Sequence, residues 1–229
     1  QYLRLLKRVW STPDTEDYKY TVDPIPIEGI MKVIAVYPGR FQPFHKGHGE
    51  VYKWLKQKFG QAIIATSNKV EPPKSPFNFS EKRQMMELAG VASGDIKEVK
   101  NPYIATEILD HYDPKTTVLV FAISEKDMQD DPRFSFKPTR SGAPSYLQPF
   151  PKNAKDLQPF GDAKKPRGYV IVTPTFQFNV LGEPMKSATE LRKQFSEADS
   201  AEQKQIIIDL YGKYSTKVHK LMASKIKKQ

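Results

Sequence analysis

The stretch that decides the fold is VIAVYPGRFQPFHKGH, residues 33–48. It opens with four continuous apolar residues, which predict a strand buried on both faces at residues 32–37. It closes with two histidines, and the sequence VYKWLKQKF that follows has apolar positions three and four residues apart. That spacing predicts a core-facing helix over residues 47–59. The histidines therefore belong to a turn between a buried strand and a helix.

Strand and helix patterns alternate along the rest of the chain. Further strands are predicted at QAIIATS, IKEV, TTVLVFAI and GYVIVTP, and further helices from Ser80 to Gly90, around residues 105–111, and at 187–195, 201–211 and 214–227. The crossovers are long enough for parallel pairing, so we predict an open, mainly parallel, doubly wound α/β sheet with helices on both faces. Such sheets bind ligands at the carboxyl ends of their strands, near the topological switch point.

Composition shifts predict three regions. Residues 1–29 read as a helical arm and a proline-containing linker, residues 30–198 as the main domain, and residues 199–229 as basic C-terminal helices. An insertion at about residues 128–168 contains five aromatic residues and many of the 19 prolines of the chain. Long segments without regular structure are usually functional or disordered, and the aromatic residues argue against disorder. A lid, a substrate clamp and a partner-docking surface all remain open for it.

The bulk composition limits the classes of partner and compartment. The chain has 229 residues, a net charge of +10 and no cysteine, which excludes disulfides and thiolate metal sites. No apolar run approaches the roughly 18 residues that span a membrane, and no secretory signal opens the chain. The positive charge favours polyanionic partners such as phosphorylated small molecules or nucleic acid. We therefore expect a cytoplasmic protein.

The turn itself has the composition of an anion site. Histidines three residues apart at a helix start project to the same side, where their ring N–H groups and the helix amides converge. Gly47 lets a phosphate approach the backbone, and Gly39 allows the sharp exit from the strand. Arg40 adds a charged fork that suits phosphate oxygens. The alternative is a basic surface loop or a stray metal site.

GRFQPFHKGH resembles the motif of the HxGH nucleotidyltransferases, and its GRFQPFH form is closest to nicotinamide-mononucleotide adenylyltransferases. KSATELR, residues 186–192, is similar to the second landmark of this family, a Ser/Thr-rich turn that opens a helix and ends in arginine. PFNFSEKRQMM, from Pro76, resembles the segment in which a basic residue contacts phosphate. Ser187 and Glu190 also fit an ordinary helix capping box, which is compatible with the family motif.

The resemblance implies the following site. Catalytic residues are His45, His48 and Arg192, and substrate-binding residues are Gly39, Arg40, Phe41, Gly47, Lys82, Arg83, Ser124, Asp127, Ser187 and Thr189, with no protein ligand set for a metal. Either Lys82 or Arg83 would make the phosphate contact. Ser124 and Asp127 lie in AISEKD, which lacks the glycine of the Gly-Ser-Asp-like turn in many relatives.

The implied activity is transfer of AMP from ATP, accompanied by Mg²⁺, to nicotinamide mononucleotide, giving NAD and pyrophosphate. A cytidylyltransferase or an enzyme for another phosphorylated acceptor is the nearest alternative. A second alternative is a nucleotidyltransferase-like domain kept as a structural or assembly protein, as a homo-oligomer or as a bacteriophage virion component. Direct nucleic-acid binding has only the net charge in its favour.

Overall fold

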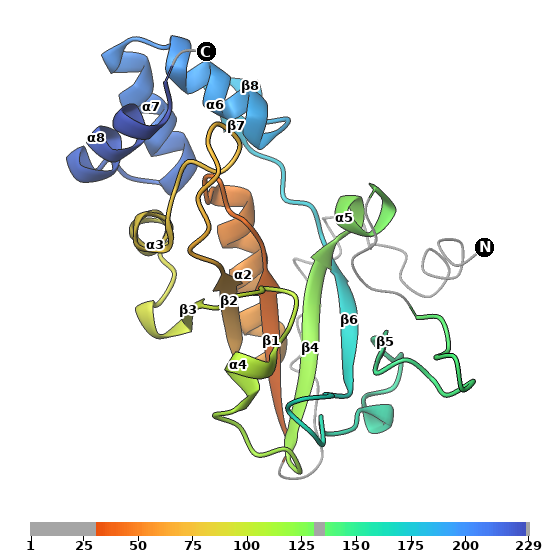
Figure 1. The fold of residues 1–229 in the computed structure, drawn as a ribbon. Coiled ribbons are helices and arrows are strands. Elements are labelled where there is room, and N and C mark those ends of the chain that lie inside the picture. Colours follow the sequence, from red (N-terminus) through yellow and green to blue (C-terminus); the bar gives the residue numbers. More distant parts are fainter. Residues whose placement is uncertain (1–30, 131–135, 228–229) are drawn as a thin grey trace. The chain divides into compact units, whose positions relative to one another are not determined.

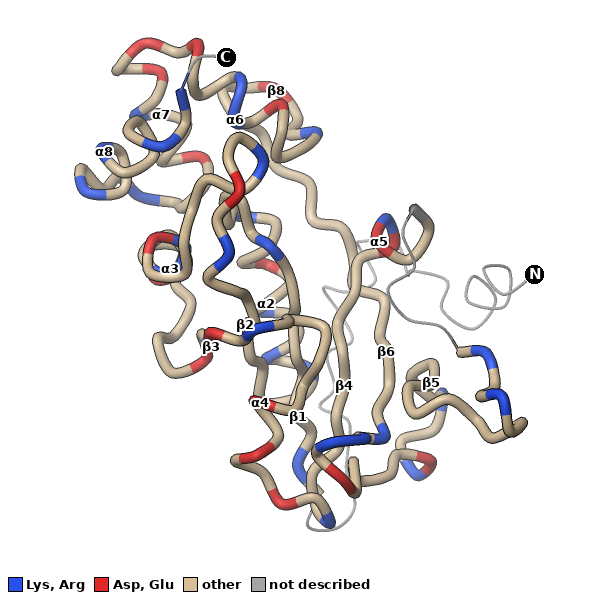
Figure 2. The backbone as a smooth tube through the Cα atoms, in the orientation of Figure 1, with Lys and Arg blue, Asp and Glu red and all other residues tan. Residues whose placement is uncertain are grey.

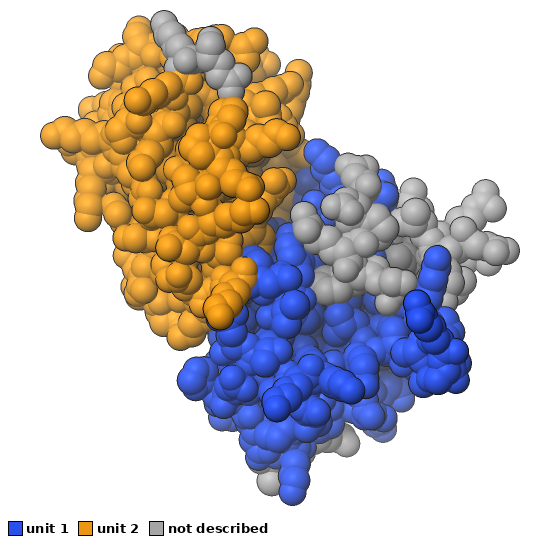
Figure 3. Space-filling view, in the orientation of Figure 1, with its two compact units in different colours: residues 1–38, 51–65, 101–175 blue, residues 39–50, 66–100, 176–229 orange. Residues whose placement is uncertain are grey.

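The computed structural model of the chain describes residues 31–130 and 136–227. The helical arm predicted within residues 1–29 lies outside that part. The described residues group into two compact units, each made of several chain segments (Figure 3). Unit 1 includes residues 51–65 and 101–175, and unit 2 comprises residues 39–50, 66–100 and 176–229. The domain boundary predicted at residue 198 stays a prediction.

A six-stranded sheet has the order β3-β2-β1-β4-β6-β5 (Figure 1). Its strands are β1 (Lys32–Pro38), β2 (Ala62–Thr66), β3 (Ile96–Glu98), β4 (Thr117–Ser124), β5 (Leu147–Pro149) and β6 (Gly168–Thr173). β1 pairs in parallel with β2 and β4, and β6 pairs in parallel with β4 and β5. The predicted doubly wound α/β fold is confirmed.

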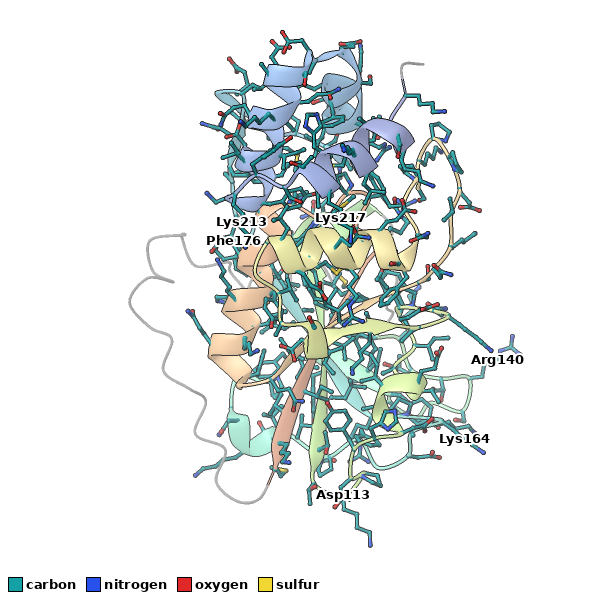
Figure 4. The ribbon with its side chains drawn as sticks, turned by 90° about the vertical axis from the view of Figure 1, so that its left-hand side faces the viewer. Asp113, Arg140, Lys164, Phe176, Lys213 and Lys217 are labelled. Carbon is teal, nitrogen blue, oxygen red and sulfur yellow. The ribbon has the colours of Figure 1, made fainter. Side chains whose placement is uncertain are left out.

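The strand order places the topological switch point between β1 and β4. From β1 the chain moves outward through β2 to β3, and it then returns to the other side of β1 to form β4. α2 (Lys46–Phe59) begins in unit 2, and its part from residue 51 onward belongs to unit 1. Within unit 1, that part of α2 and α4 (Thr106–Leu109) lie on opposite faces of the sheet (Figure 4). β1 and β4 are buried almost throughout, as their continuous apolar runs predict. The turn that carries the two motif histidines, residues 39–48, is called the histidine turn, and it begins directly after β1, at this switch point.

The predicted insertion contributes to the sheet. It holds β5 and a short 3-10 turn at Ala154–Asp156, and it follows α5 (Glu125–Asp130). Phe150 is buried and packs edge-on against Phe59, with ring centroids 5.6 Å apart, and Leu157 and Phe160 are also buried. Residues 136–168 are therefore held by apolar burial and strand pairing, which differs from the long segment without regular structure that the prolines predicted.

Unit 2 is mainly helical. Its helices are α3 (Phe79–Leu88), α6 (Ala188–Glu197), α7 (Ser200–Tyr211) and α8 (Thr216–Lys225). α7 packs against α6 and α8, and α8 also packs against α3. The predicted helices are confirmed, although Asn78 rather than Ser80 caps α3. A hairpin of β7 (Asn179–Val180) and β8 (Glu183–Pro184) was not predicted. Within the described residues, no helix is long and apolar enough to cross a bilayer.

Candidate active site

The turn after β1 is shaped by aromatic packing around its first glycine. Phe41 has a φ of 51°, and its ring folds back so closely that a Cβ on Gly39 would lie 2.8 Å from it. Phe41 and Phe44 are buried, and their ring centroids lie 5.0 and 5.4 Å from that of His48. Gly39 is therefore required because the Phe41 ring lies where a side chain at position 39 would begin. The Phe41 ring in turn packs against the ring of His48.

The two motif histidines form a stacked pair. Their ring centroids are 3.5 Å apart with an interplanar angle of 17°. The backbone N–H of His45 donates to Nδ1 of His48 at 3.2 Å, and the backbone N–H of His48 donates to Nδ1 of His45 at 3.3 Å. Because each Nδ1 accepts a hydrogen bond, a neutral ring must have its proton on Nε2. Each histidine is thus held as an Nε2–H donor.

Burial keeps both rings neutral. It lowers the pKa of His45 to about 3, and an interaction with the backbone of His45 itself opposes this shift. The pKa of His48 is also well below its usual value, first through burial and then through the neighbouring His45. The sequence predicted that helix amides and ring N–H groups would converge on an anion. The amides of His45 and His48 donate to the rings, so these two are directed at protein atoms, and the convergence of the remaining groups on an anion stays a prediction.

Gly47 has a steric role between the histidines. A Cβ at this position would lie 3.0 Å from Cε1 and 3.2 Å from Nδ1 of His45, and 3.2 Å from the carbonyl oxygen of Phe176. These contacts are tighter than ordinary van der Waals separation. Gly47 therefore leaves the His45 ring the room it needs to stack, in addition to any close approach of a ligand. Phe178, whose ring centroid lies 5.1 Å from that of His45, was not predicted as part of the site.

Arg192 joins the second motif to the first. Its Nη1 donates to the carbonyl oxygen of Gln42 at 2.7 Å, and its Nη2 lies 3.4 Å from Thr189 Oγ1. Partial burial, and then the charge of Arg40, lower the pKa of Arg192. The two predicted motifs, 150 residues apart in the chain, thus meet in unit 2. The cluster is rich in positive charge and suits an anionic ligand.

Gln42 links the turn to the segment before α3. Its side-chain amide donates to the carbonyl oxygen of Phe77 at 2.8 Å and accepts from the Phe77 N–H at 2.9 Å. The glutamine is buried, so the loss of either bond would leave the donor and the acceptor of that bond without each other in a buried place. Gln42 lies inside the quoted motif, yet nothing in the sequence distinguishes its role in holding the turn from direct contact with a ligand.

Lys82 and Arg83 have different environments on α3. Lys82 is buried, and its Nζ donates to Thr66 Oγ1 at 2.5 Å, to the Ser67 carbonyl at 2.7 Å and to the Arg40 carbonyl at 3.2 Å. Burial lowers the pKa of Lys82 to about 8, and Glu98 opposes this shift. The Arg83 side chain is 41% exposed and bonds to Glu87. Lys82 is the inward residue, and it holds the turn at Arg40.

Ser187 and Ser124 both cap helices. Ser187 Oγ accepts from the Glu190 N–H at 3.1 Å and so caps the start of α6, which is the Ser187 half of the predicted capping box. Ser124 Oγ accepts from the Asp127 N–H at 3.1 Å at the start of α5, in unit 1. The role of Ser124 and Asp127 in nucleotide binding stays a prediction. The described residues include no group of three or more His, Asp or Glu side chains arranged to hold a metal.

Comparison with known proteins places this chain in a family. The model of a family described as cytidylyltransferase-like matches residues 36–159, which is more than half of the 229-residue chain. The chain belongs to the cytidylyltransferase-like family. The resemblance to HxGH nucleotidyltransferases is thereby confirmed at the level of the family. The matched part of this cytidylyltransferase-like chain includes the histidine turn and Lys82, and Arg192 lies beyond it.

Individual relatives cover shorter stretches of this cytidylyltransferase-like chain. Nicotinamide-nucleotide adenylyltransferase 1 of Sulfolobus acidocaldarius is 38% identical over 68 residues, which is 28% of this chain and 39% of the relative. Phosphopantetheine adenylyltransferase of Buchnera aphidicola is 41% identical over 69 residues, covering 30% of this chain and 41% of the relative. The alignments thus span about two fifths of the length of these two relatives.

A solved structure is also similar. It is a bifunctional NMN adenylyltransferase/ADP ribose pyrophosphatase from Francisella tularensis complexed with AMP and a manganese ion. It has a TM-score of 0.43 and 18% identity, and the match covers 85% of this chain and 52% of that one.

Proposed function

We propose that this protein is an adenylyltransferase that transfers AMP from ATP to a phosphorylated acceptor, with nicotinamide mononucleotide as the acceptor. The observation that carries the proposal is the stacked histidine pair, whose two Nε2–H groups are fixed as donors by the Nδ1 hydrogen bonds. The meeting of Arg192 with this turn supports it further. Family membership and the two adenylyltransferase relatives favour a nucleotidyl transfer over simple anion binding.

In the proposed reaction, a phosphate oxygen of the acceptor attacks the α-phosphorus of ATP. A new P–O bond forms, the bond from the α-phosphorus to the α,β-bridging oxygen breaks, and pyrophosphate leaves with that electron pair. His45 and His48 donate from Nε2 to α-phosphate oxygens as negative charge develops there. Since the rings are neutral, they act as hydrogen-bond donors and not as cations. One such preorganised donor contributes about 3 kcal/mol, or roughly 100-fold in rate.

Arg192 is proposed to hold the β- and γ-phosphates. Two of its five N–H groups are directed at Gln42 and Thr189, so the remaining donors are available to phosphate oxygens. Arg40 is exposed and is proposed to contact phosphate of the triphosphate or of the product. Lys82 acts indirectly, because its donors are directed at protein oxygens.

Mg²⁺ is proposed to enter with ATP. The donor set of the turn consists of neutral histidines, an arginine and a buried lysine, which suits phosphate oxygens and not a hard cation. The ion would therefore be held by the triphosphate and water, and it would supply charge neutralisation to the leaving pyrophosphate.

The test is an assay of the full chain with ATP, Mg²⁺ and nicotinamide mononucleotide, in which NAD and pyrophosphate are measured separately. NAD formation that falls roughly 100-fold in His48→Ala and in Arg192→Ala supports the proposal. Lys220→Ala, an exposed change on α8, is the control and should leave the rate unaltered. Replacement of nicotinamide mononucleotide by phosphopantetheine, and of ATP by CTP, tests the acceptor and the donor. No product with any pair would overturn the proposal.

A further inference from the structure

A pocket of about 310 Å³ lies in unit 2 along one side of α6. Thr189, Arg192, Lys193 and Ser196 line it from α6, and Lys225 and Lys227 line it from the end of α8. Pro73, Pro76 and Ile226 form an apolar part of the wall. Arg192 thus faces this pocket and also bonds to the histidine turn, so the pocket adjoins the candidate active site.

The pocket has an excess of positive charge. Four cationic side chains and one carboxylate, that of Glu197, line it. Lys225 is 3.6 Å from Glu81, whereas Lys193 and Lys227 form no ion pair within residues 31–130 and 136–227. Figure 2 shows basic positions on both α6 and α8. Unneutralised cations that converge on a concave surface are the usual arrangement for a multivalent anion.

We propose that this pocket binds a polyphosphate group, with Lys193 and Lys227 as ligands beside Arg192. The Thr189 hydroxyl offers a donor to the same oxygens, whereas the Ser196 hydroxyl already donates to the carbonyl oxygen of Lys193. Thr189 and Ser196 are seven residues apart on α6, which is about 10 Å at the α-helical rise. A single phosphate would fill only part of a pocket wall of that length, whereas a chain of two or three phosphates is long enough to extend along it.

Two sources share this chemistry. One is the terminal part of the donor triphosphate held by Arg192, and this source rests on the proposed function. The other is a free polyphosphate, including the pyrophosphate product, bound independently of the donor. In either case the segment just after α8 gains a role in ligand binding through Lys227, which lies outside both sequence motifs.

Calorimetric titration of the full chain with inorganic tripolyphosphate tests the proposal. We expect the Lys193→Ala/Lys227→Ala variant to bind on the order of tenfold more weakly than the unaltered chain. The control is Lys213→Ala/Lys217→Ala, which removes the same charge from exposed lysines that do not line the pocket (Figure 4). If the affinity for tripolyphosphate falls equally in both variants, net charge alone explains the effect. If the affinity is unchanged in the pocket variant, the pocket is not the binding site. Either result overturns the proposal.

A second titration distinguishes the two sources. Tripolyphosphate that no longer binds once ATP is saturating identifies the pocket with the donor triphosphate, whereas binding beside ATP identifies a separate polyphosphate site. Both readouts are independent of turnover. A chain that forms no NAD but shows the expected tripolyphosphate difference would refute the proposed function and leave the polyphosphate site standing.

Discussion

Lys82 is the most informative single position, because it buries an ammonium group that bonds to the turn after β1 at the Arg40 carbonyl. Its three hydrogen bonds go to Thr66, Ser67 and Arg40, and Glu98 is the nearby charge that opposes the burial effect. Lys82→Met removes the charge and the bonds while keeping a long, unbranched side chain. At pH 7 the change removes donors from the buried Thr66 hydroxyl and from the partly buried carbonyls of Ser67 and Arg40, at about 1–3 kcal/mol for each buried group left unpaired. It also relieves the cost of burying the ammonium.

The pH dependence separates these opposing effects. The pKa of Lys82 is lowered from 10.5 to about 8 in the folded chain. Below pH 8 both folded and unfolded chains hold the proton, and the burial cost is fully present. Between about pH 8 and 10.5 the unfolded chain binds more protons, so the free energy of unfolding rises with pH. The calculated gain from this group between pH 8 and 10 is about 2 kcal/mol.

The assay is urea unfolding of the unaltered chain and of Lys82→Met at intervals from pH 7 to pH 10. The difference in unfolding free energy between the two should widen in favour of the unaltered chain by about 2 kcal/mol above pH 8. Lys74→Met, an exposed change just before α3, is the matched control and should follow the unaltered chain. Parallel curves for Lys82→Met and the unaltered chain would refute a buried ammonium with a lowered pKa.

Three further predictions concern the turn and α6. Gly47→Ala should reduce NAD formation at least tenfold, because the new methyl group meets His45 and the Phe176 carbonyl; unaltered activity would show that the turn can yield. The pH profile of kcat/KM should show no inflection near 6.5, since burial lowers the pKa of both motif histidines; an inflection there that is lost in His45→Ala would contradict this. Ser187→Ala should lower the unfolding free energy by about 1 kcal/mol, because the Glu190 N–H loses its cap. Ser187→Asp should restore the lost free energy, and urea unfolding measures both variants. An unfolding free energy that is unchanged in Ser187→Ala would show that the cap does not contribute.

The sheet was predictable because β1 and β4 are buried on both faces, and strands of this kind have continuous apolar runs in the sequence. Parallel pairing followed from the alternation of strands with helices and from crossovers long enough for it, whereas the strand order comes from the structure. β5 could not be predicted, since it has three residues and ends in Pro149. Its pairing comes from tertiary packing around Phe150, which no local pattern specifies.

The candidate site was predictable in its residue types and less so in its hydrogen bonds. The family resemblance assigned Arg192 to the same site as the turn, and the structure has Arg192 donating to the carbonyl oxygen of Gln42 in that turn. The sequence left Lys82 and Arg83 as alternatives, since either could face inward on a helix whose register was uncertain. It also could not show that the ring Nδ1 atoms accept backbone hydrogen bonds, because that depends on the ring orientations in the folded turn.

The short strand β5 protects the edge of the sheet from pairing with another molecule of the same chain. It covers the outer edge of β6, and it offers only three residues along its own outer edge, one of which is a proline without an N–H. A new strand therefore finds little backbone to join on that side. A chain shortened by removal of residues 136–167 would instead leave β6, with its run of buried aliphatic residues, as an open template for edge-to-edge aggregation.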